Sequence, residues 1–177
     1  MLLRSWLKES FDIISIDDFF SDEDCLACVE SAESGDWRQS NLGTRKIQGC
    51  RIDRGAVEKK LAGHLPEEIK GWHYAGISPK TFQVFKYTEN DTFPDHQDGA
   101  IKESDDVQSL LTIVVYLNKV AGGATRFPEI PLAIPPQKGK AVIFPQNHVH
   151  NSARIEKGLK YILRGQILYR NVNGLPY

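Results

Sequence analysis

A histidine and an aspartate two residues apart, read together with a second histidine about fifty residues later, constrain this chain more than any other feature. His96 and Asp98 stand in the stretch TFPDHQDG, and His150 stands in FPQNHVHNS. On an extended strand, side chains two residues apart leave the same face, close enough to bind one ion together. A third ligand from a distant segment completes such a site. We therefore expect a fold that brings these two distant segments side by side.

Two histidines and one carboxylate on one side of a metal, with the opposite positions open, form the facial triad of non-haem Fe(II) oxygenases. A His-x-Asp triplet alone is weak evidence, because it also occurs in ordinary solvated turns. Here Pro94 precedes the pair and Gly99 follows it, so the pair is expected at the rim of a strand that is about to turn. Catalytic ligands concentrate at such loop ends when a rigid scaffold carries them.

The composition of the chain is that of an ordinary soluble protein with one domain, residues 1–177, and a formal net charge of -1. This charge predicts neither a nucleic-acid surface nor a membrane surface. Arg4, Lys8 and Glu9 interrupt the apolar residues at the start before a signal-peptide core is long enough. Three cysteines, an odd number, fit a reducing compartment. We predict a cytoplasmic location.

Cys25 and Cys28 form the motif CLAC, which is also found in redox and zinc sites. A redox site needs a strand before the motif, and a zinc site needs a second pair of ligands at matching spacing. Neither is evident, whereas the acidic residues 22–24 after Ser21 are typical of a helix start. We interpret the two cysteines as residues one turn apart on a helix that extends to about Ser34.

The first part of the chain is expected to hold one strand, Ile13 to Ile16, and two helices. The first helix ends near Ser34, and the second runs from Ala56 to Leu65, with an extension to Lys70 as an alternative. Between them, residues 35–54 are polar and basic. This stretch is either a solvated loop or a flap that faces the substrate, and solvation is favoured.

From Lys80 onward the pattern changes to short runs of β-branched and aromatic residues separated by Gly, Pro and Asn. These runs predict strands at Thr81 to Tyr87, Leu110 to Leu117, Ala141 to Phe144 and Tyr161 to Tyr169. Helices followed by many strands predict a mainly β protein with flanking helices (α+β). The expected core is a double-stranded β-helix, the jelly-roll variant of cupins, over about 79–170, buttressed by helical support over about 1–75.

The turn signal Glu156-Lys157-Gly158 suggests a hairpin after His150. If the turn centres near Ile155, Lys160 lies opposite His150 and its ammonium points into the same cavity as the metal ligand. A buried ammonium is costly unless an anion meets it. Fe(II) oxygenases commonly use 2-oxoglutarate, which chelates iron at one end and has a free carboxylate at the other. Lys160 is therefore predicted to bind that distal carboxylate.

From about Ile13 to Arg170, the chain resembles the prolyl 4-hydroxylase-like family of Fe(II)/2-oxoglutarate-dependent dioxygenases. The resemblance is carried by VFKYTENDTFPDHQDG, LLTIVVYLN, GGATRFPE and KGKAVIFPQNHVHNSARIEKGLKYILR. It implies that His96, Asp98 and His150 are the iron ligands. It also implies that Lys160, ten residues after the distal histidine, is the basic residue for 2-oxoglutarate.

The resemblance further implies that Tyr87 and Tyr116 line the 2-oxoglutarate pocket. Strand alternation places Thr112 and Val114 on the same face as Tyr116, so Thr112 is a candidate to add a hydroxyl to that pocket. For Tyr87 a buried core tyrosine is a reasonable alternative.

Two further assignments, the third metal ligand and the role of Arg164, each have an alternative. His148 competes with His150 for the third ligand position, and His150 is preferred because it alone lies ten residues before Lys160. Arg164 follows Lys160 by four residues and shares its face of the strand. Arg164 either reaches the substrate or pairs with an internal carboxylate, and the two interpretations have equal weight.

The activity that the resemblance implies is hydroxylation of an unactivated aliphatic C–H bond by O2, with release of succinate and CO2 and with ascorbate as a candidate cofactor. We expect the substrate to be a prolyl or other amino-acid residue in a peptide or protein. A free amino acid, a natural-product small molecule and a non-catalytic cupin-like binding module are alternatives. A nucleic-acid demethylase is a weaker one, because such enzymes have arginine where this chain has Lys160. The segments 35–54 and 99–109 are expected to shape the substrate choice.

Overall fold

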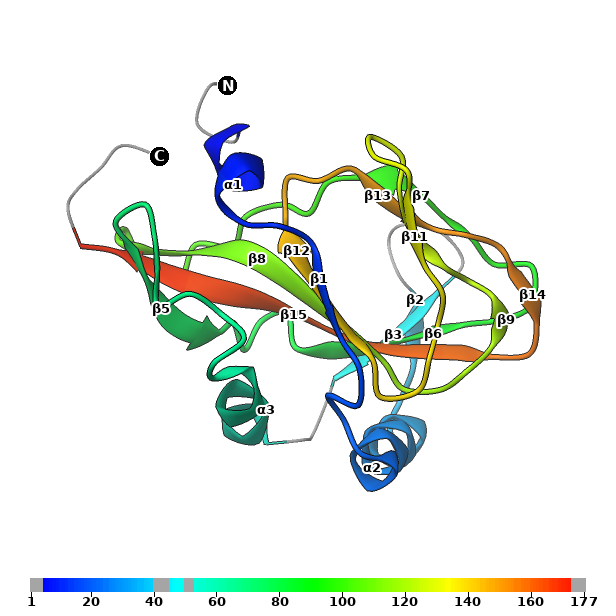
Figure 1. Ribbon diagram of the computed structural model, residues 1–177. Helices are drawn as coiled ribbons and strands as arrows, with labels where there is room; N and C mark the ends of the chain where they lie inside the picture. The colour runs from blue at the N-terminus through cyan, green and yellow to red at the C-terminus, as the bar shows by residue number, and fades with distance from the viewer. Residues whose placement is uncertain (1–4, 40–44, 50–52, 173–177) are drawn as a thin grey trace.

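The structure is a computed structural model that describes residues 5–39, 45–49 and 53–172. It consists of two facing antiparallel sheets with helices on the outer side of the larger one, as Figure 1 shows. This arrangement confirms the predicted mainly β fold with a double-stranded β-helix core. The described residues contain three helices: α1 (Ser5–Ser10), α2 (Asp22–Glu33) and α3 (Arg54–Leu61).

The major sheet has β8 and β15 as its long central strands (Figure 1). Its main path runs through β1 (Ile14–Ile16), β12 (Ala141–Pro145), β8 (Val107–Tyr116), β15 (Lys160–Asn171), β6 (Gln83–Tyr87), β3 (Lys46–Gly49) and β2 (Arg38–Gln39). The first residues of β15 pair with β6, and its last residues pair with β5 (Trp72–Ile77). Strand β5 in turn pairs with β4 (Glu68–Ile69). The four strands expected after Lys80 are all present in this sheet.

The minor sheet follows the order β11 (Leu132–Ile134), β10 (Thr125–Phe127), β13 (His150–Ser152) and β7 (Phe93–His96). A separate pair consists of β14 (Ile155–Lys157) and β9 (Ala121–Gly122). The minor sheet faces the major sheet on the side away from α2 and α3 (Figure 1).

Strand β8 divides the interior into two cores. Leu111, Ile113 and Val115 belong to the core between the major sheet and the helices. Val114 and Tyr116 belong to the core between the two sheets. This alternation follows from the two-residue period of a strand, and it confirms that Val114 and Tyr116 share a face.

Helix α2 begins with a capping box, in which Ser21 Oγ accepts the Asp24 N–H and the Asp24 carboxylate accepts the Ser21 N–H. Cys25 and Cys28 on this helix are buried in the core beneath the major sheet. Their place on a helix confirms the structural interpretation of the CLAC motif.

Two expectations for the first half of the chain are wrong. Helix α3 ends at Leu61, and neither Leu65 nor Lys70 continues it, because Gly63 takes a left-handed conformation with φ of 84° that interrupts the helix. The favoured solvated loop over 35–54 instead contains β2 and β3, and β3 pairs with β6 in the major sheet. Residues 40–44 and 50–52 of that stretch lie outside the described residues.

The expected hairpin after His150 is also wrong. Strand β13 pairs with β7 and β10 in the minor sheet, whereas Lys160 begins β15 in the major sheet. The intervening β14 pairs with β9 in the separate two-stranded sheet, and the turn at Gly158 leads the chain from β14 into β15 of the major sheet. His150 and Lys160 therefore face each other across the space between the sheets and are not partners within one hairpin.

The segment after the metal-ligand pair, residues 99–109, folds back on the start of β8. Ser109 Oγ accepts the Ile101 N–H at 2.9 Å, and the Ser109 N–H donates to the Ile101 carbonyl at 2.9 Å. Lys102 forms an isolated bridge with Gln108. Among the described helices, none has the length and apolar content that a membrane span requires.

Gly139 joins the N-terminal segment to the turn before β12. Its carbonyl accepts the Phe20 N–H at 3.0 Å, and its N–H donates to the Tyr116 carbonyl at 2.9 Å. Its φ is 80°, and a Cβ placed there would lie 2.4 Å from the Phe20 carbonyl oxygen. Both the backbone conformation and the close contact therefore require glycine.

We expect Gly139→Ala to lower the free energy of unfolding by more than about 2 kcal/mol, since the alanine meets backbone in addition to the left-handed strain. Gly63→Ala is the matched control, because Gly63 has a similar φ of 84°, but a Cβ placed there would have no atom within 4 Å. Only the strain of about 1–2 kcal/mol is expected there. Urea unfolding measures both, and equal losses would contradict the proposed backbone contact.

Candidate metal and co-substrate site

The two histidines of the expected triad are cross-strand neighbours in the minor sheet. His150 on β13 is the direct partner of His96 on β7, and their ring centroids lie 4.1 Å apart. Directly opposed residues of an antiparallel pair project from the same face. The pairing of two short strands thus brings together ligands that are far apart in the sequence, as expected.

Asp98 reaches the site from a loop, because β7 ends at His96 and does not extend to the aspartate as the sequence suggested. The Asp98 N–H donates to the Gln146 carbonyl at 2.9 Å, which fixes the loop beside the end of β12. Its carboxylate accepts hydrogen bonds from Thr112 Oγ1 and from Arg164 Nη2, each at 2.6 Å. The side chain is only 5% exposed, so its orientation is fixed on several sides.

Hydrogen bonds also fix the tautomer of each histidine. Nδ1 of His96 lies 3.0 Å from the Pro94 carbonyl, and Nδ1 of His150 lies 3.0 Å from the His148 carbonyl. A carbonyl oxygen can only accept, so Nδ1 carries the proton and Nε2 keeps its lone pair. The Nε2 atoms lie 3.8 and 3.9 Å from the Asp98 carboxylate oxygens, a spacing too long for hydrogen bonds and suited to an ion between them.

The protonation states of the three groups suit a divalent cation. Burial lowers the pKa of His150 to about 4, and burial also lowers the pKa of His96. Burial opposes ionisation of Asp98, but the Arg164 guanidinium and the other neighbours outweigh it and hold the pKa of this carboxyl below its usual value. Two neutral imidazoles and one carboxylate, with ligand atoms within 4.8 Å of one another, fit the facial triad of Fe(II).

His148 lies outside this cluster. Its ring packs against Phe127, and its Nδ1 is 4.0 Å from the Glu129 carboxylate. Its carbonyl serves the site by accepting the Nδ1–H of His150. The geometry therefore favours His150 over His148 as the third ligand.

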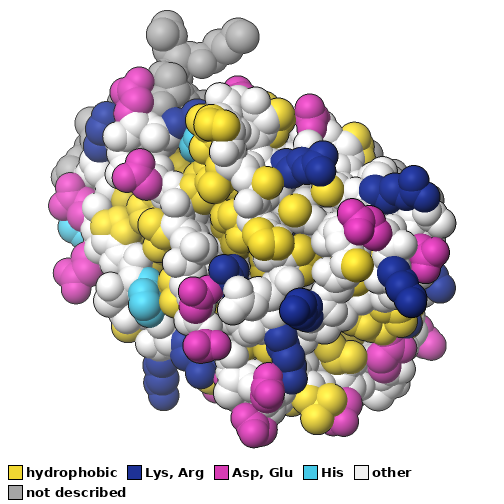
Figure 2. Space-filling view, turned by 45° about the vertical axis from the view of Figure 1, so that its right-hand side comes forward, with side chains coloured by type: hydrophobic (Ala, Val, Ile, Leu, Met, Phe, Trp, Pro, Cys, Tyr) yellow, Lys and Arg dark blue, Asp and Glu magenta, His cyan; other side chains and the backbone are white. Residues whose placement is uncertain are grey.

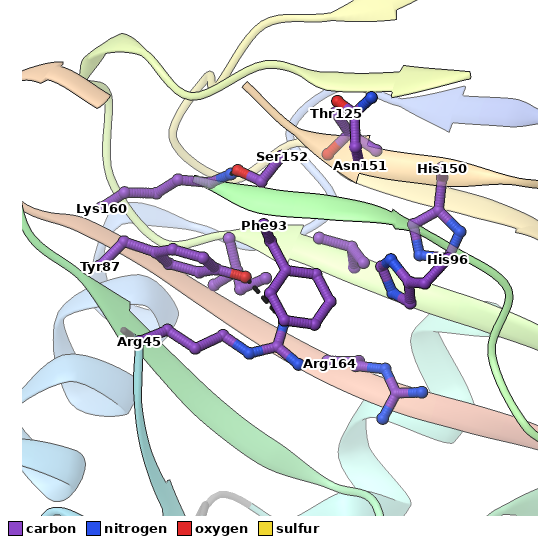
Figure 3. A pocket seen from close by; sticks show the side chains of 12 residues that line it. Arg45, Tyr87, Phe93, His96, Thr125, His150, Asn151, Ser152, Lys160 and Arg164 are labelled. Carbon is purple, nitrogen blue, oxygen red and sulfur yellow. Dashed lines mark hydrogen bonds between the residues drawn. The ribbon is translucent and has the colours of Figure 1, made fainter. Parts of the chain in front are cut away.

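Lys160 lies at the opposite end of a cavity from the two histidines, as Figure 3 shows. Its side chain is 1% exposed, and Nζ donates to the Gly123 carbonyl at 2.6 Å and to Ser152 Oγ at 2.7 Å. The ammonium also lies 5.0 Å from the centroid of the Tyr87 ring. Burial, with a smaller contribution from the Arg45 charge, lowers the pKa of Lys160 to about 7.

The cavity lies in the space between the two sheets. Aromatic and aliphatic side chains separate its two charged ends. The described residues that line it are Arg45, Tyr87, Phe93, His96, Val114, Thr125, His150, Asn151, Ser152, Lys160, Ile162 and Arg164.

The remaining predicted residues take different positions around this cavity. Tyr87 lines it directly. Tyr116 is fully buried behind it and donates to Thr125 Oγ1 at 2.6 Å. Thr112 is absent from the described lining and contacts Asp98 instead. Arg164 lines the cavity and also pairs with Asp98, so the expected internal carboxylate partner is present, while its contact with substrate stays a prediction.

Several lining residues escaped the sequence analysis, notably Arg45, Phe93, Thr125 and Ser152. Thr125 and Ser152 are cross-strand partners on β10 and β13, so a strand assignment there would have placed them together. Arg45 precedes β3, and no periodic pattern marks that strand. Its place follows from the pairing of β3 with β6.

Thr112→Val is expected to weaken metal binding about 10- to 100-fold, because a hydrogen bond that orients the ligand carboxylate is lost. Thr125→Val is the matched control, since Thr125 bonds to Tyr116 and does not contact the triad. Calorimetric titration with Mn²⁺, a redox-stable substitute for Fe(II), measures both variants. Wild-type affinity in Thr112→Val would show that this hydroxyl does not position Asp98.

Comparison with known proteins agrees with this geometry. Residues 82–167 match the family model described as the 2OG-Fe(II) oxygenase superfamily. No curated protein matches the sequence. His96, Asp98, His150 and Lys160 all lie within the matched residues.

Solved structures with the same fold include several prolyl hydroxylases, all of low sequence identity. The viral collagen prolyl hydroxylase of Paramecium bursaria Chlorella virus-1, in complex with 2-oxoglutarate, is 21% identical with a TM-score of 0.65, over 92% of this chain and 98% of that one. A Pseudomonas putida prolyl-4-hydroxylase is 14% identical with a TM-score of 0.66, over 94% and 98% of the two chains.

A third structure is the prolyl hydroxylase of Trichoplax adhaerens in complex with a peptide fragment of the oxygen degradation domain of hypoxia inducible factor. It is 13% identical with a TM-score of 0.70, over 93% of this chain and 86% of that one. These structures share the fold of this chain, and the family model shows sequence similarity to the superfamily over residues 82–167. Together with the His-Asp-His cluster, the similarity to the 2OG-Fe(II) oxygenase superfamily over residues 82–167 supports a 2-oxoglutarate-dependent dioxygenase with a prolyl 4-hydroxylase-like fold.

Proposed function

We propose that this dioxygenase hydroxylates an unactivated aliphatic C–H bond of a prolyl or other amino-acid residue within a peptide or protein, with release of succinate and CO2. The observation that carries the proposal is the single cavity with the His96, Asp98 and His150 cluster at one end and the buried Lys160 at the other. A ligand with a chelating end and a distal carboxylate, such as 2-oxoglutarate, fits between them.

The chain's own residues divide the work between the two ends of the cavity. His96, Asp98 and His150 would hold Fe(II), and Lys160 with Ser152 would receive the distal carboxylate of 2-oxoglutarate. When bound, iron and 2-oxoglutarate supply the oxidising chemistry that inserts one oxygen atom of O2 into a C–H bond. The protein supplies ligand geometry, the position of the co-substrate and the exclusion of water.

Apolar side chains support the exclusion of water from this cavity. Phe93, Val114 and Ile162 line it and are each no more than 6% exposed. A dry cavity protects reactive species from side reactions and strengthens the charge interactions at both ends. Arg45 and Arg164 are less buried than Lys160, so we place the substrate on their side of the cavity.

The peptide substrate is supported by the fold likeness to prolyl hydroxylases, one of which is in complex with a peptide. On the face that Figure 2 shows, basic and acidic side chains are interspersed around a central band of hydrophobic ones, an arrangement that differs from the basic patch of a nucleic-acid surface. The proposal includes dependence on ascorbate, which the family resemblance implies. It also includes a cytoplasmic location, which the cysteine content favours.

The test is to incubate the protein with Fe(II), 2-oxoglutarate and O2 and a panel of proline-containing peptides, and to measure succinate and peptide mass. We expect a peptide that gains one oxygen atom in equal amount to the succinate formed. Asp98→Ala is the control and should form neither product. Coupled succinate from free amino acids, with every peptide unchanged, would contradict the peptide assignment and favour the small-molecule alternative.

Affinity for 2-oxoglutarate is expected to depend on pH through Lys160. In the free protein, the amine is protonated below about pH 7 and increasingly neutral above it, while the bound carboxylate favours the charged form. Binding above pH 7 therefore requires uptake of a proton, and the affinity should fall as the pH rises, by up to about tenfold per pH unit. Below pH 7 this dependence should disappear.

Lys160→Met should bind 2-oxoglutarate much more weakly and without this pH dependence, while its affinity for metal stays close to that of the wild type. Anaerobic titrations with 2-oxoglutarate across the pH range provide the measurement. A wild-type affinity that is independent of pH above 7, or an unchanged affinity in Lys160→Met, would remove Lys160 from the co-substrate site.

A further inference from the structure

Three uncharged polar side chains are buried in the major sheet beside the loop that carries Asp98. They are Ser109 on β8, Gln146 directly after β12 and Gln166 on β15. Their exposed fractions are 0%, 6% and 1%. A buried polar group is costly unless it is hydrogen-bonded, so the partners of these three side chains indicate what they do.

The side-chain amide of Gln166 holds the backbone directly after the metal ligand. Its Nε2 donates to the Gly99 carbonyl at 2.7 Å and to Gln146 Oε1 at 3.1 Å. A carbonyl oxygen can only accept, so the amide nitrogen faces Gly99 and both of its protons are used. Gln166 thereby restricts the backbone of the residue next to Asp98.

Gln146 holds the backbone of the ligand itself. Its main-chain carbonyl accepts the Asp98 N–H at 2.9 Å. Its side-chain Oε1 accepts a hydrogen bond from Ser109 Oγ at 2.9 Å in addition to that from Gln166, and its Nε2 donates to the Ser109 carbonyl. The side chain of Gln146 therefore ties its own carbonyl, and with it Asp98, to β8 and β15.

Ser109 extends these contacts farther along the loop. Its Oγ accepts the Ile101 N–H, and its N–H donates to the Ile101 carbonyl, each at 2.9 Å. One connected set of hydrogen bonds thus reaches the backbone of Asp98, Gly99 and Ile101. Hydrogen bonds in such a set orient one another, so the loss of one member is felt by the others.

A metal ligand on a loop needs support that a ligand on a strand does not. His96 and His150 are held by the pairing of their strands, whereas Asp98 follows the end of β7. Thr112 and Arg164 contact the carboxylate of Asp98, but these bonds do not fix the backbone from which the side chain starts. The three buried side chains supply that support.

We propose that Ser109, Gln146 and Gln166, together named the polar network, position the metal ligand Asp98 by holding the backbone of residues 98–101. Gln166 is the central positioning residue, because it bonds both to the loop and to Gln146. The inference rests on the metal site of the proposed function and is independent of the substrate. It is therefore tested by metal binding, without turnover.

The experiment measures Mn²⁺ binding by calorimetric titration in wild type, Gln166→Met and Thr81→Val. Gln166→Met keeps a similar volume and removes both amide donors. Thr81→Val is the matched control, because buried Thr81 accepts the main-chain N–H of Gln166 through Oγ1 at 3.1 Å. The control thus removes one buried hydrogen bond of the same residue that lies outside the loop 98–101.

We expect Gln166→Met to bind Mn²⁺ about tenfold more weakly, the lower end of the range for residues that orient metal ligands. Thr81→Val should keep the wild-type affinity, whatever stability it loses in thermal unfolding. Ser109→Ala should also weaken Mn²⁺ binding, and it provides the test if Gln166→Met does not fold.

A double variant separates positioning from general destabilisation. Gln166→Met combined with Thr112→Val should lose less Mn²⁺ affinity than the product of the two single losses, because both changes act through the orientation of Asp98. At saturating metal, the charge-transfer band of the anaerobic Fe(II) and 2-oxoglutarate complex is a second readout. The band should shift in Gln166→Met, since a reoriented carboxylate donates differently to the metal, and should stay unshifted in Thr81→Val.

Wild-type Mn²⁺ affinity in folded Gln166→Met, or an equal loss in Thr81→Val, would overturn the inference. Losses that multiply in the double variant, or an unshifted band in Gln166→Met, would overturn it as well, because Gln166 would then act independently of Asp98. Failure of the wild type to bind metal would overturn both the inference and the proposed function. The expected variant effects in a protein that hydroxylates no peptide would support the inference and contradict the proposed function alone.

Discussion

The pairing of β13 with β7 is the constraint on which the site depends, because it alone places His150 beside His96. Asp98 joins them through its hydrogen bond to the Gln146 carbonyl, so the third ligand depends on the end of β12 in the opposite sheet. Thr112 and Arg164, both on the major sheet, then orient the carboxylate. The metal site is therefore built across both sheets, and the spacing between the sheets determines its geometry.

The same space between the sheets separates the two ends of the cavity. Lys160 starts β15 in the major sheet, yet its Nζ donates to Ser152 on β13 in the minor sheet. The strand that carries His150 thus also helps to hold the lysine. This shared strand links the geometry of the metal end to that of the co-substrate end, while Phe93 and Ile162 keep the interval between them apolar.

The sequence predicted those parts of the fold that rest on local patterns. The two-residue alternation of β8 placed Val114 and Tyr116 on the inner face, and the acidic run after Ser21 located the start of α2. Lys160 reached the cavity, but by a route other than the expected hairpin, because β14 and its pairing with β9 lie between β13 and β15. A turn signal shows where the chain reverses, but it does not show which sheet the next strand joins.

The rest of the site depends on pairings between distant segments that leave little local signal. Arg45 enters the cavity because β3, only four residues long, pairs with β6. Phe93 and Thr125 line it because β7 and β10 both flank β13. Strands of three or four residues are too short for a periodic pattern to be recognised. Which residues of these short strands face the cavity is seen only once the strands are paired in the sheet.

The most direct test of the central claim is the visible spectrum of the protein under anaerobic conditions after addition of Fe(II) and then 2-oxoglutarate, recorded for wild type, His148→Ala and His150→Ala. The expected result is a metal-to-ligand charge-transfer band of the chelated complex in wild type and His148→Ala that is absent in folded His150→Ala. A band that persists in His150→Ala, or that is absent from the wild type, would contradict the assignment of this site.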